Sequence, residues 1–332
     1  MTRSAIARRF GRVDRFRLLG ATGYVSDDTE QAALIAQALI ESPDDLDRAV
    51  RLFRRGLLGW ACRLPWGVGR ATVRACGRIA LGRRRSGVPS AGNGAAMRSA
   101  IVGVFFRDRP AERRDWARRF AEVTHVDPRA VDGAIYVAEV AAAAAGLDPG
   151  RSRADAVAFA ISILPDGELA GTLARAAALA RAEAETEAAA TVTGRSGYVV
   201  ATVAFATFLY LRHGDDPMHA WVEGIAAGGD ADTIAAILGG WMGAERGEAG
   251  LPGRLIARLQ DGPFGPTHLR ALAEALAAAD DGVGRRPPRY SRLGALVRNL
   301  ALWPVILAHG FRRLIPTGLA GRLESGGGPG RS

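Results

Sequence analysis

A glycine-led segment in the last third of the sequence gathers oxygen-bearing side chains just before an apolar run of helical spacing. Gly228-Gly229 gives the backbone freedom to turn, and Asp230, Asp232 and Thr233 follow directly. Two carboxylates separated by one residue can converge on a cation if the backbone turns there. Oxygen ligands without Cys or a nearby His suit Mg²⁺, Mn²⁺ or Ca²⁺ rather than zinc. The simpler alternative is that Asp230 or Asp232 only caps the following helix.

A second segment of this kind lies near the N-terminus, where Ser26, Asp27 and Asp28 precede another helical pattern. Asp27 and Glu30 fit a helix-capping pair. Capping needs only one acid, and adjacent like charges repel, so the extra carboxylate indicates a cation. We therefore predict that the two helix starts face each other. Together they would suffice for a two-metal site, in which ions about 3.5–4 Å apart activate a water and hold substrate oxygens.

Two weaker candidates lie between these segments. Asn93 stands between Gly92 and Gly94, where backbone N–H groups could bind a phosphate at a helix start, although an ordinary turn is the simpler interpretation. His125, beside Asp127, could contact a ligand or merely cap a helix. The sequence shows no recognisable nucleophile elbow for Ser-His-Asp catalysis.

Helices must position these residues. Ala is abundant, β-branched and aromatic residues are sparse, and most apolar runs repeat at helical spacing, so we predict an all-α fold. The range 130–145 is almost continuously apolar and should form a buried helix. The range 168–190 alternates Arg and Glu and should form one solvent-facing helix. Further helical patterns cover 110–122, 151–164, 199–212, 253–260 and 267–279.

The net charge of +10 is concentrated at the two ends of the chain. Residues 1–25 hold six Arg and one Asp, residues 282–332 hold nine Arg and one Glu, and the residues between them sum to about −3. A slightly acidic body argues against a nucleic-acid partner. We predict a basic N-terminal segment (1–25), a globular domain (26–282) and an Arg/Gly/Pro-rich tail (283–332).

The tail contains a short apolar run, Leu300 to Leu307, between arginines. We expect it to be too short to span a bilayer but able to lie on a membrane surface, and no other apolar run has spanning length.

No signal peptide precedes the body. Cys62 and Cys76 lack CxxC spacing, so we expect two buried thiols in a reduced, cytoplasmic protein, and we expect a monomer.

Taken in chain order, four motifs resemble those of the ADP-ribosylglycohydrolase family, which includes dinitrogenase reductase-activating glycohydrolase. The resemblance covers roughly residues 20–252 and implies a compact, all-α single domain with two Mg²⁺ (or Mn²⁺) ions at the base of an ADP-ribose cleft. The motifs are Ser26-Asp27-Asp28-Thr29-Glu30-Gln31, Gly92-Asn93-Gly94-Ala95-Ala96-Met97-Arg98, Thr124-His125 with Asp127, and Gly228-Gly229-Asp230-Ala231-Asp232-Thr233.

The resemblance also implies roles for individual residues. Asp28 and Asp230 would be catalytic carboxylates, Asn93 and Gly94 would line the diphosphate, and His125 would contact the nucleotide. The reaction would be hydrolysis of the N- or O-glycosidic bond at ribose C1″ of an ADP-ribosylated protein or small molecule. The implied metal ligands are Ser26, Asp27, Asp28, Asp230, Asp232 and Thr233.

The sequence departs from the family pattern before the first metal motif. Family members usually begin with a Gly/Ala-rich helix that contains a Gly-Asp pair and a Glu, but residues 1–25 contain Asp14 and no Glu. Either the start codon is annotated too late or the helix has been lost. In the second case the protein would be a non-catalytic relative that binds ADP-ribose and Mg²⁺.

Overall fold

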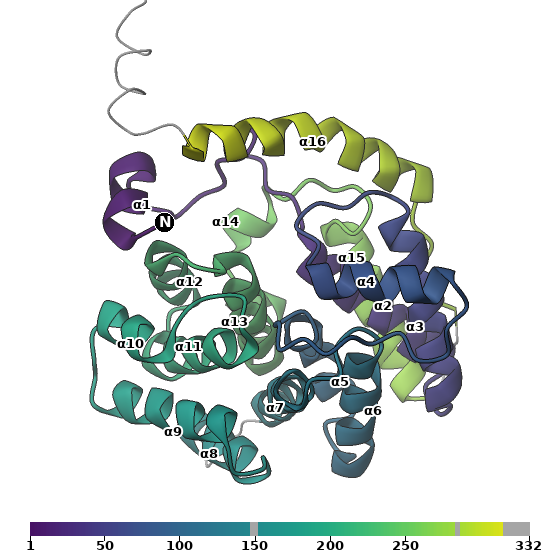
Figure 1. Cartoon of the computed structure of the whole chain (residues 1–332), viewed down its shortest axis with the longest axis horizontal. Coiled ribbons are helices and arrows are strands. Elements are labelled where there is room, and N and C mark those ends of the chain that lie inside the picture. Colours follow the sequence, from purple (N-terminus) through teal and green to yellow (C-terminus); the bar gives the residue numbers. More distant parts are fainter. Residues whose placement is uncertain (147–151, 283–285, 315–332) are drawn as a thin grey trace, which may run out of the picture.

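The computed structural model describes residues 1–146, 152–282 and 286–314, with the backbone alone for 312–314, and every regular element in these ranges is a helix (Figure 1). The predicted all-α class is confirmed. The helices are α1 (Arg3–Phe10), α2 (Asp27–Glu41), α3 (Leu46–Ala61), α4 (Arg70–Ala80), η1 (Ala96–Arg98), α5 (Ala100–Phe105), α6 (Pro110–Glu122), α7 (Pro128–Ala145), α8 (Arg153–Ser162), α9 (Glu168–Arg181), α10 (Thr186–Thr193), α11 (Val199–His213), α12 (Pro217–Ala227), α13 (Ala231–Arg246), η2 (Glu248–Gly250), α14 (Gly253–Ile256), α15 (Pro266–Asp280) and α16 (Arg292–Leu314).

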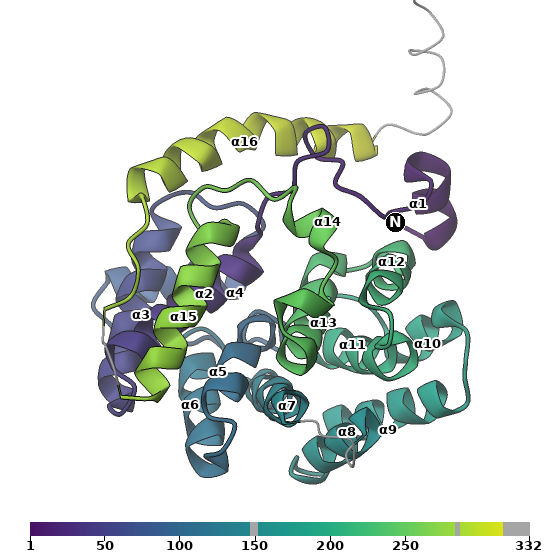
Figure 2. The same ribbon diagram turned by 180° about the vertical axis from the view of Figure 1, so that it is seen from behind.

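Helix α7 lies at the centre and carries apolar side chains on all sides. Tyr136, Val137 and Val140 pack in one core cluster with α8, α9, α11 and α13. Val131 and Ile135 pack in a second cluster with α2, α3, α5, α6 and α15. Figures 1 and 2 show these two groups of helices on either side of α7. A helix that is hydrophobic all round is buried, so the prediction of a buried helix over 130–145 is confirmed.

The single helix predicted over 168–190 is wrong. It is divided into α9 and α10, because Glu183 has a φ of 53°, a left-handed conformation that interrupts the helix. Nor does α9 simply face solvent, since Leu169 and Leu173 are buried against the core. Most of the alternating charges lie at the break: Arg181 ends α9, Glu183 and Glu185 lie between the helices, and Glu187 is in α10.

The tail helix is longer than the sequence pattern indicates. The run Leu300–Leu307 is the middle of α16, which continues through Arg298 and past Pro304 and lies across one end of the molecule (Figure 1). By length and composition, α16 is the one helix in the described ranges long and apolar enough to cross a membrane, with 17% of its apolar window buried. The expectation that no run has spanning length is therefore corrected.

The two cysteines differ in exposure. Cys62 is exposed rather than buried, whereas Cys76 is buried as expected.

A buried ion pair joins α6 to the central helix. Arg113 Nε and Nη2 donate to the two carboxylate oxygens of Glu139 at 2.9 and 2.8 Å, and both residues are buried. Arg113 Nη1 also donates to the backbone oxygens of Phe106 and Arg107 at 2.9 and 2.8 Å. The guanidinium thus compensates a carboxylate within the core and caps the end of α5.

Removal of one partner should cost more than removal of both. We expect Arg113→Met to lower the free energy of unfolding by about 3 kcal/mol, because Glu139 loses its bidentate partner and keeps only Arg114, whose Nε lies 3.0 Å from Glu139 Oε1. The double variant Arg113→Met/Glu139→Leu should lose clearly less than the sum of the two single variants. Denaturant unfolding of the four proteins measures this, and strictly additive losses would contradict it.

Candidate active site

The starts of α2 and α13 come together although they lie at opposite ends of the predicted domain. Besides burial, the charge of Asp232 raises the pKa of the Asp28 carboxylate of α2, and the Thr233 hydroxyl of α13 lowers it, so these groups lie near one another. Helix α13 packs directly against α2. The structure therefore places the two acidic segments in one cluster.

At the start of α2, both acids are buried. Ser26, at the N-cap, donates its hydroxyl to Asp28 Oδ2 at 2.6 Å. Asp27 Oδ2 accepts from the Gln31 amide at 3.3 Å, and Gly67 lies against Asp27 Oδ1, where an added Cβ would come within 3.3 Å. Asp28 Oδ1 is buried with no hydrogen-bond partner among the described residues. One carboxylate oxygen thus lacks the contact that burial normally requires.

At the start of α13, a glycine turn aims the acids into the cluster. Gly228 and Gly229 have φ values of 80° and 78°, which glycine adopts at little cost. Asp230 N then donates to Arg195 O at 2.8 Å. Asp230 Oδ2 accepts from the Asn93 amide at 2.6 Å, so the loop before η1 positions this carboxylate.

The electrostatics of the cluster follow from burying like charges. Burial, followed by repulsion from Asp28 and Asp232, raises the pKa of Asp27 to about 8. Burial also raises the pKa of Asp28, partly opposed by the Ser26 hydrogen bond. Burial and the neighbouring Asp232 raise the pKa of Asp230 to about 6, against the Asn93 hydrogen bond. These carboxylates need a positive partner to ionise together.

The residue set fits a hard divalent cation. No group of three or more His, Cys, Asp or Glu side chains in the described part of the chain stands ready to hold a metal. Three acids of this cluster instead accept hydrogen bonds from the side chains of Ser26, Gln31 and Asn93. However, the orphaned oxygen of Asp28, the mutual repulsion and the two hydroxyls supply an all-oxygen donor set suited to Mg²⁺ or Mn²⁺. The metal role of these residues stays a prediction.

A buried arginine that the sequence analysis did not select connects the acids to the predicted nucleotide end. Arg98 Nη1 donates to Gln31 Oε1 at 2.7 Å, and Gln31 in turn reaches Asp27. Arg98 Nη2 donates to Thr124 Oγ1 at 2.6 Å. Burial lowers the pKa of Arg98 to about 10. The only sequence indication was that Gln31 and Arg98 belong to the motif segments.

His125 is buried at the other end of this network. The Thr124 hydroxyl accepts from Arg98 and lies 2.8 Å from His125 Nδ1, so a hydrogen bond joins the imidazole to this network. The ring lies against Gly94, where an added Cβ would be 3.0 Å from Cε1. The structure thus brings together Asn93, Gly94 and His125, and links them to the acids.

Comparison with known proteins identifies the family. The ADP-ribosylglycohydrolase family model matches residues 1–286, which includes the N-terminal segment outside the motif resemblance. The chain belongs to the ADP-ribosylglycohydrolase family. It is 32% identical over 247 residues to an uncharacterized protein of Archaeoglobus fulgidus, covering 73% of this chain and 77% of that protein. It is also similar in fold to an ADP-ribosylglycohydrolase-related protein complex, with a TM-score of 0.52 and 24% identity over 83% of this chain and 82% of that one.

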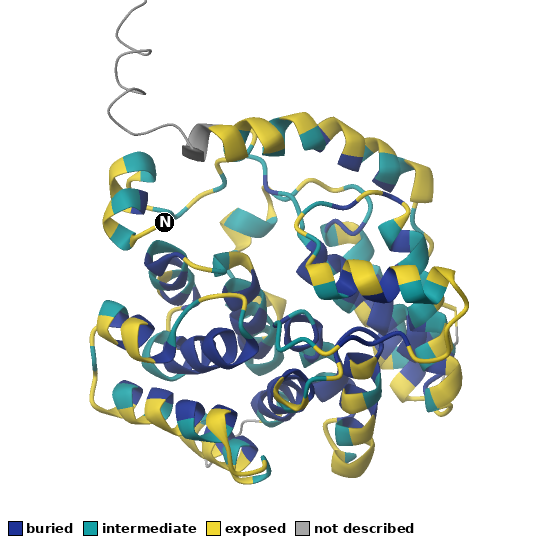
Figure 3. Ribbon diagram, viewed as in Figure 1, coloured by how far each residue is buried: buried dark blue, intermediate teal, exposed yellow. Residues whose placement is uncertain are grey.

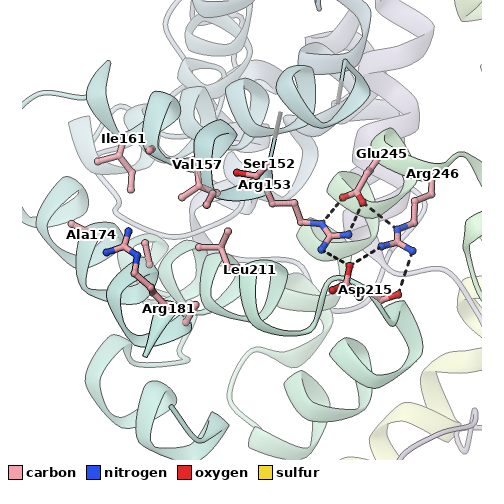
Figure 4. Close-up of a pocket in the computed structure, with 14 residues that line it drawn as sticks. Ser152, Arg153, Val157, Ile161, Ala174, Arg181, Leu211, Asp215, Glu245 and Arg246 are labelled. Carbon is pink, nitrogen blue, oxygen red and sulfur yellow. Dashed lines mark hydrogen bonds and ion pairs between the residues drawn. The ribbon is translucent and has the colours of Figure 1, made fainter. Parts of the chain in front are cut away.

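The ADP-ribosylglycohydrolase fold also holds a cavity of about 1020 Å³ away from the acids, between α8, α9, α11 and α13 (Figure 4). Of its charged residues, Arg153, Asp215, Glu245 and Arg246 bind one another, and Arg181 lies apart from them. Arg153 donates to Glu245 at 2.6 Å and to Asp215 at 2.9 Å, and Arg246 donates to the backbone oxygen of Gly214 at 2.8 Å. Because these ions are already paired, we assign the chemistry to the acidic cluster.

Protonation of His125 should destabilise the protein in acid. Burial and the nearby Arg98 charge lower the pKa of His125 to about 3, so below an unfolded-state pKa near 6.5 the unfolded chain binds more protons than the folded one. Stability linked to His125 is therefore lost as the pH falls. Between pH 7 and 5, wild type should lose about 2 kcal/mol relative to His125→Gln. Urea unfolding at several pH values measures this. His309→Gln is the control, and parallel curves for wild type and His125→Gln would refute the expectation.

The glycine turn should tolerate no side chain. An added Cβ at Gly229 would lie 1.9 Å from Arg195 O, whereas Gly247, also at positive φ, meets nothing within 4 Å. We expect Gly247→Ala to cost roughly 1 kcal/mol and Gly229→Ala to cost clearly more, because only the second displaces backbone. Thermal unfolding compares them, and equal losses would show that close approach does not constrain the turn.

Proposed function

We propose that the protein hydrolyses the glycosidic bond at ribose C1″ of an ADP-ribosylated protein or small molecule, in a reaction that depends on Mg²⁺ or Mn²⁺. Family membership supports glycosyl hydrolase chemistry. The observation that carries the finer proposal is the convergence of the buried acids of α2, the half-buried Asp230 and the exposed Asp232 of α13 around the unpartnered oxygen of Asp28.

The first part of the proposed mechanism is assembly of the centre. When bound, the metal ions would supply positive charge that orients ribose hydroxyls and lowers the pKa of a water. The Asn93 amide holds Asp230 in position, and the Ser26 hydroxyl holds one oxygen of Asp28. The residues that would hold the ions are Ser26, Asp27, Asp28, Asp230, Asp232 and Thr233.

The second part is proton transfer and substrate placement. The free Oδ1 of Asp28 is suited to accept a proton from the attacking water, whose oxygen bonds to C1″ as the C1″–N or C1″–O bond breaks. The leaving nitrogen or oxygen takes the bonding electron pair and a proton from solvent, and Asp28 then returns its own proton to solvent. The His125 ring lies against Gly94 at the end assigned to the nucleotide. Arg98 connects the acids to this end through its hydrogen bonds to Gln31 and Thr124.

A non-catalytic binder of ADP-ribose is the second candidate. The segment before α2 contains Asp14 but no Glu that could serve in catalysis. Its helix α1 instead joins the body through an ion pair between Arg3 and Glu223 at 2.9 Å. Calorimetry that detects ADP-ribose binding, together with no turnover of ADP-ribosylated arginine or serine in the presence of Mg²⁺, would favour this candidate. Absence of both binding and turnover would reject both candidates.

Loss of either catalytic carboxylate should abolish turnover without unfolding the protein. We expect Asp28→Asn and Asp230→Asn each to lower the release of ADP-ribose by about 10²-fold or more, because each near-isosteric amide removes a charge from the centre. Chromatographic detection of free ADP-ribose measures the rate. Asp115→Asn, an exposed acid of α6, is the matched control and should keep full activity. Wild-type rates in Asp28→Asn would contradict the assignment.

A further inference from the structure

Helix α16 buries Ala295 and Leu302 against the body, as a surface helix does, but it also carries an apolar face toward the outside. Its inward face includes Asn299, which is 1% exposed, and Arg298, whose side chain is 8% exposed. Its outward face is apolar, and Figure 3 shows exposed residues along it. We call the following outward residues the apolar stripe: Leu293, Val297, Leu300, Pro304, Leu307 and Phe311.

The apolar stripe gathers many of the exposed large hydrophobic residues of the described chain on one helix. Its five large hydrophobic side chains are 49–71% exposed and account for five of the thirteen exposed large hydrophobic residues in the described chain. Alternating spacings of four and three residues place them in one line, about 27 Å long at the rise of an α-helix. Contiguous exposed apolar surface of this kind marks an interaction site.

Hydrogen bonds between α16 and the protein body keep the apolar stripe facing outward. Arg298 pairs with the buried Glu30 of α2 and donates to Pro263 O at 2.9 Å. Asn299 Nδ2 donates to Arg63 O at 2.8 Å, and Trp303 Nε1 donates to Leu64 O at 2.9 Å. Rotating α16 to bury the stripe would break these bonds and leave Glu30 without its ion pair.

Positive charge surrounds the stripe. From Gly282 to Arg322 the sequence holds eight Arg and no Asp or Glu. Near the start of α16, Arg286, Arg289 and Arg292 are exposed. Near its other end, exposed Arg15 and Arg17 line a cavity together with His309 of α16. An apolar line with arginine at both ends is complementary to a bilayer surface that carries anionic headgroups.

We propose that α16 docks the protein on an anionic lipid bilayer, with the apolar stripe at the headgroup–acyl boundary and the flanking arginines on the headgroups. A second copy of this chain is a poorer partner, because it would bring the same arginines against each other. Crossing the bilayer is also disfavoured, since it would withdraw Arg298 into hydrocarbon and leave Glu30 a buried, uncompensated charge.

Docking through α16 would turn one side of the molecule toward the lipid. Trp66 packs under the Arg298 guanidinium at 5.4 Å, and its neighbour Gly67 touches Asp27. The cavity that includes His309 is also lined by Gly228 and Gly229. Both acidic helix starts therefore lie close to the elements that α16 covers, so the proposed reaction centre would be held near the membrane surface.

Vesicle flotation of the full chain tests the proposal. The vesicles are phosphatidylcholine alone and phosphatidylcholine mixed with phosphatidylserine. We expect binding only to the anionic vesicles and release by high salt. The variant Val297→Ser/Phe311→Ser should lower the partition coefficient by about tenfold or more, because it removes two inserting side chains. The matched control Phe159→Ser/Val192→Ser, which replaces equally exposed residues on α8 and α10, should bind like wild type.

Three results would overturn the proposal. The first is equal loss of binding in both double variants, or no binding of wild type to anionic vesicles. The second is a dimer in light scattering that Val297→Ser/Phe311→Ser dissociates, which would make the stripe a contact between copies. The third is retention on membranes after alkaline carbonate extraction, which would indicate a spanning helix. Circular dichroism of both variants should match wild type, because the substituted side chains are exposed.

Discussion

The structure depends on holding like charges close together, with Asp27 and Asp28 buried, Asp230 half-buried and Asp232 exposed. Asp27 and Asp28 from α2 meet Asp230 and Asp232 from α13, and burial with mutual repulsion raises the pKa of Asp27 to about 8. Both pairs stand at helix N-termini, where the helix dipole offsets part of the repulsion. The rest must be offset by bound protons or cations. The two core clusters joined by α7 form the rigid framework that holds the two helix starts in place.

A buried cation organises the groups around this centre. Arg98 packs over the Phe53 ring at 5.1 Å and binds Gln31 on one side and Thr124 on the other. It therefore orients Gln31, a partner of Asp27, and Thr124, a partner of His125. One guanidinium thus links the side assigned to the metal ions with the side assigned to the nucleotide.

Much of this could be predicted from the sequence, because periodic apolar runs and acidic helix starts are local patterns. The all-α class, the buried helix α7 and the family resemblance all follow from these local patterns. The break between α9 and α10 could not be predicted, since it falls at Glu183, where a non-glycine residue takes a positive φ, and no Gly or Pro marks it. The role of Arg98 was missed because its partners are distant in sequence. The length of α16 was underestimated because the arginines on either side were taken as the limits of the apolar run, although Arg298 bonds to the protein body.

Manganese binding by the intact protein tests the central claim most directly. Electron paramagnetic resonance of Mn²⁺, titrated into wild type, Asp27→Asn and Asp232→Asn, reports bound ions without any substrate. If acids from both helix starts share the ions, each single substitution should weaken binding at the whole centre by about tenfold or more. Wild-type Mn²⁺ affinity in either variant would contradict a centre built jointly by α2 and α13.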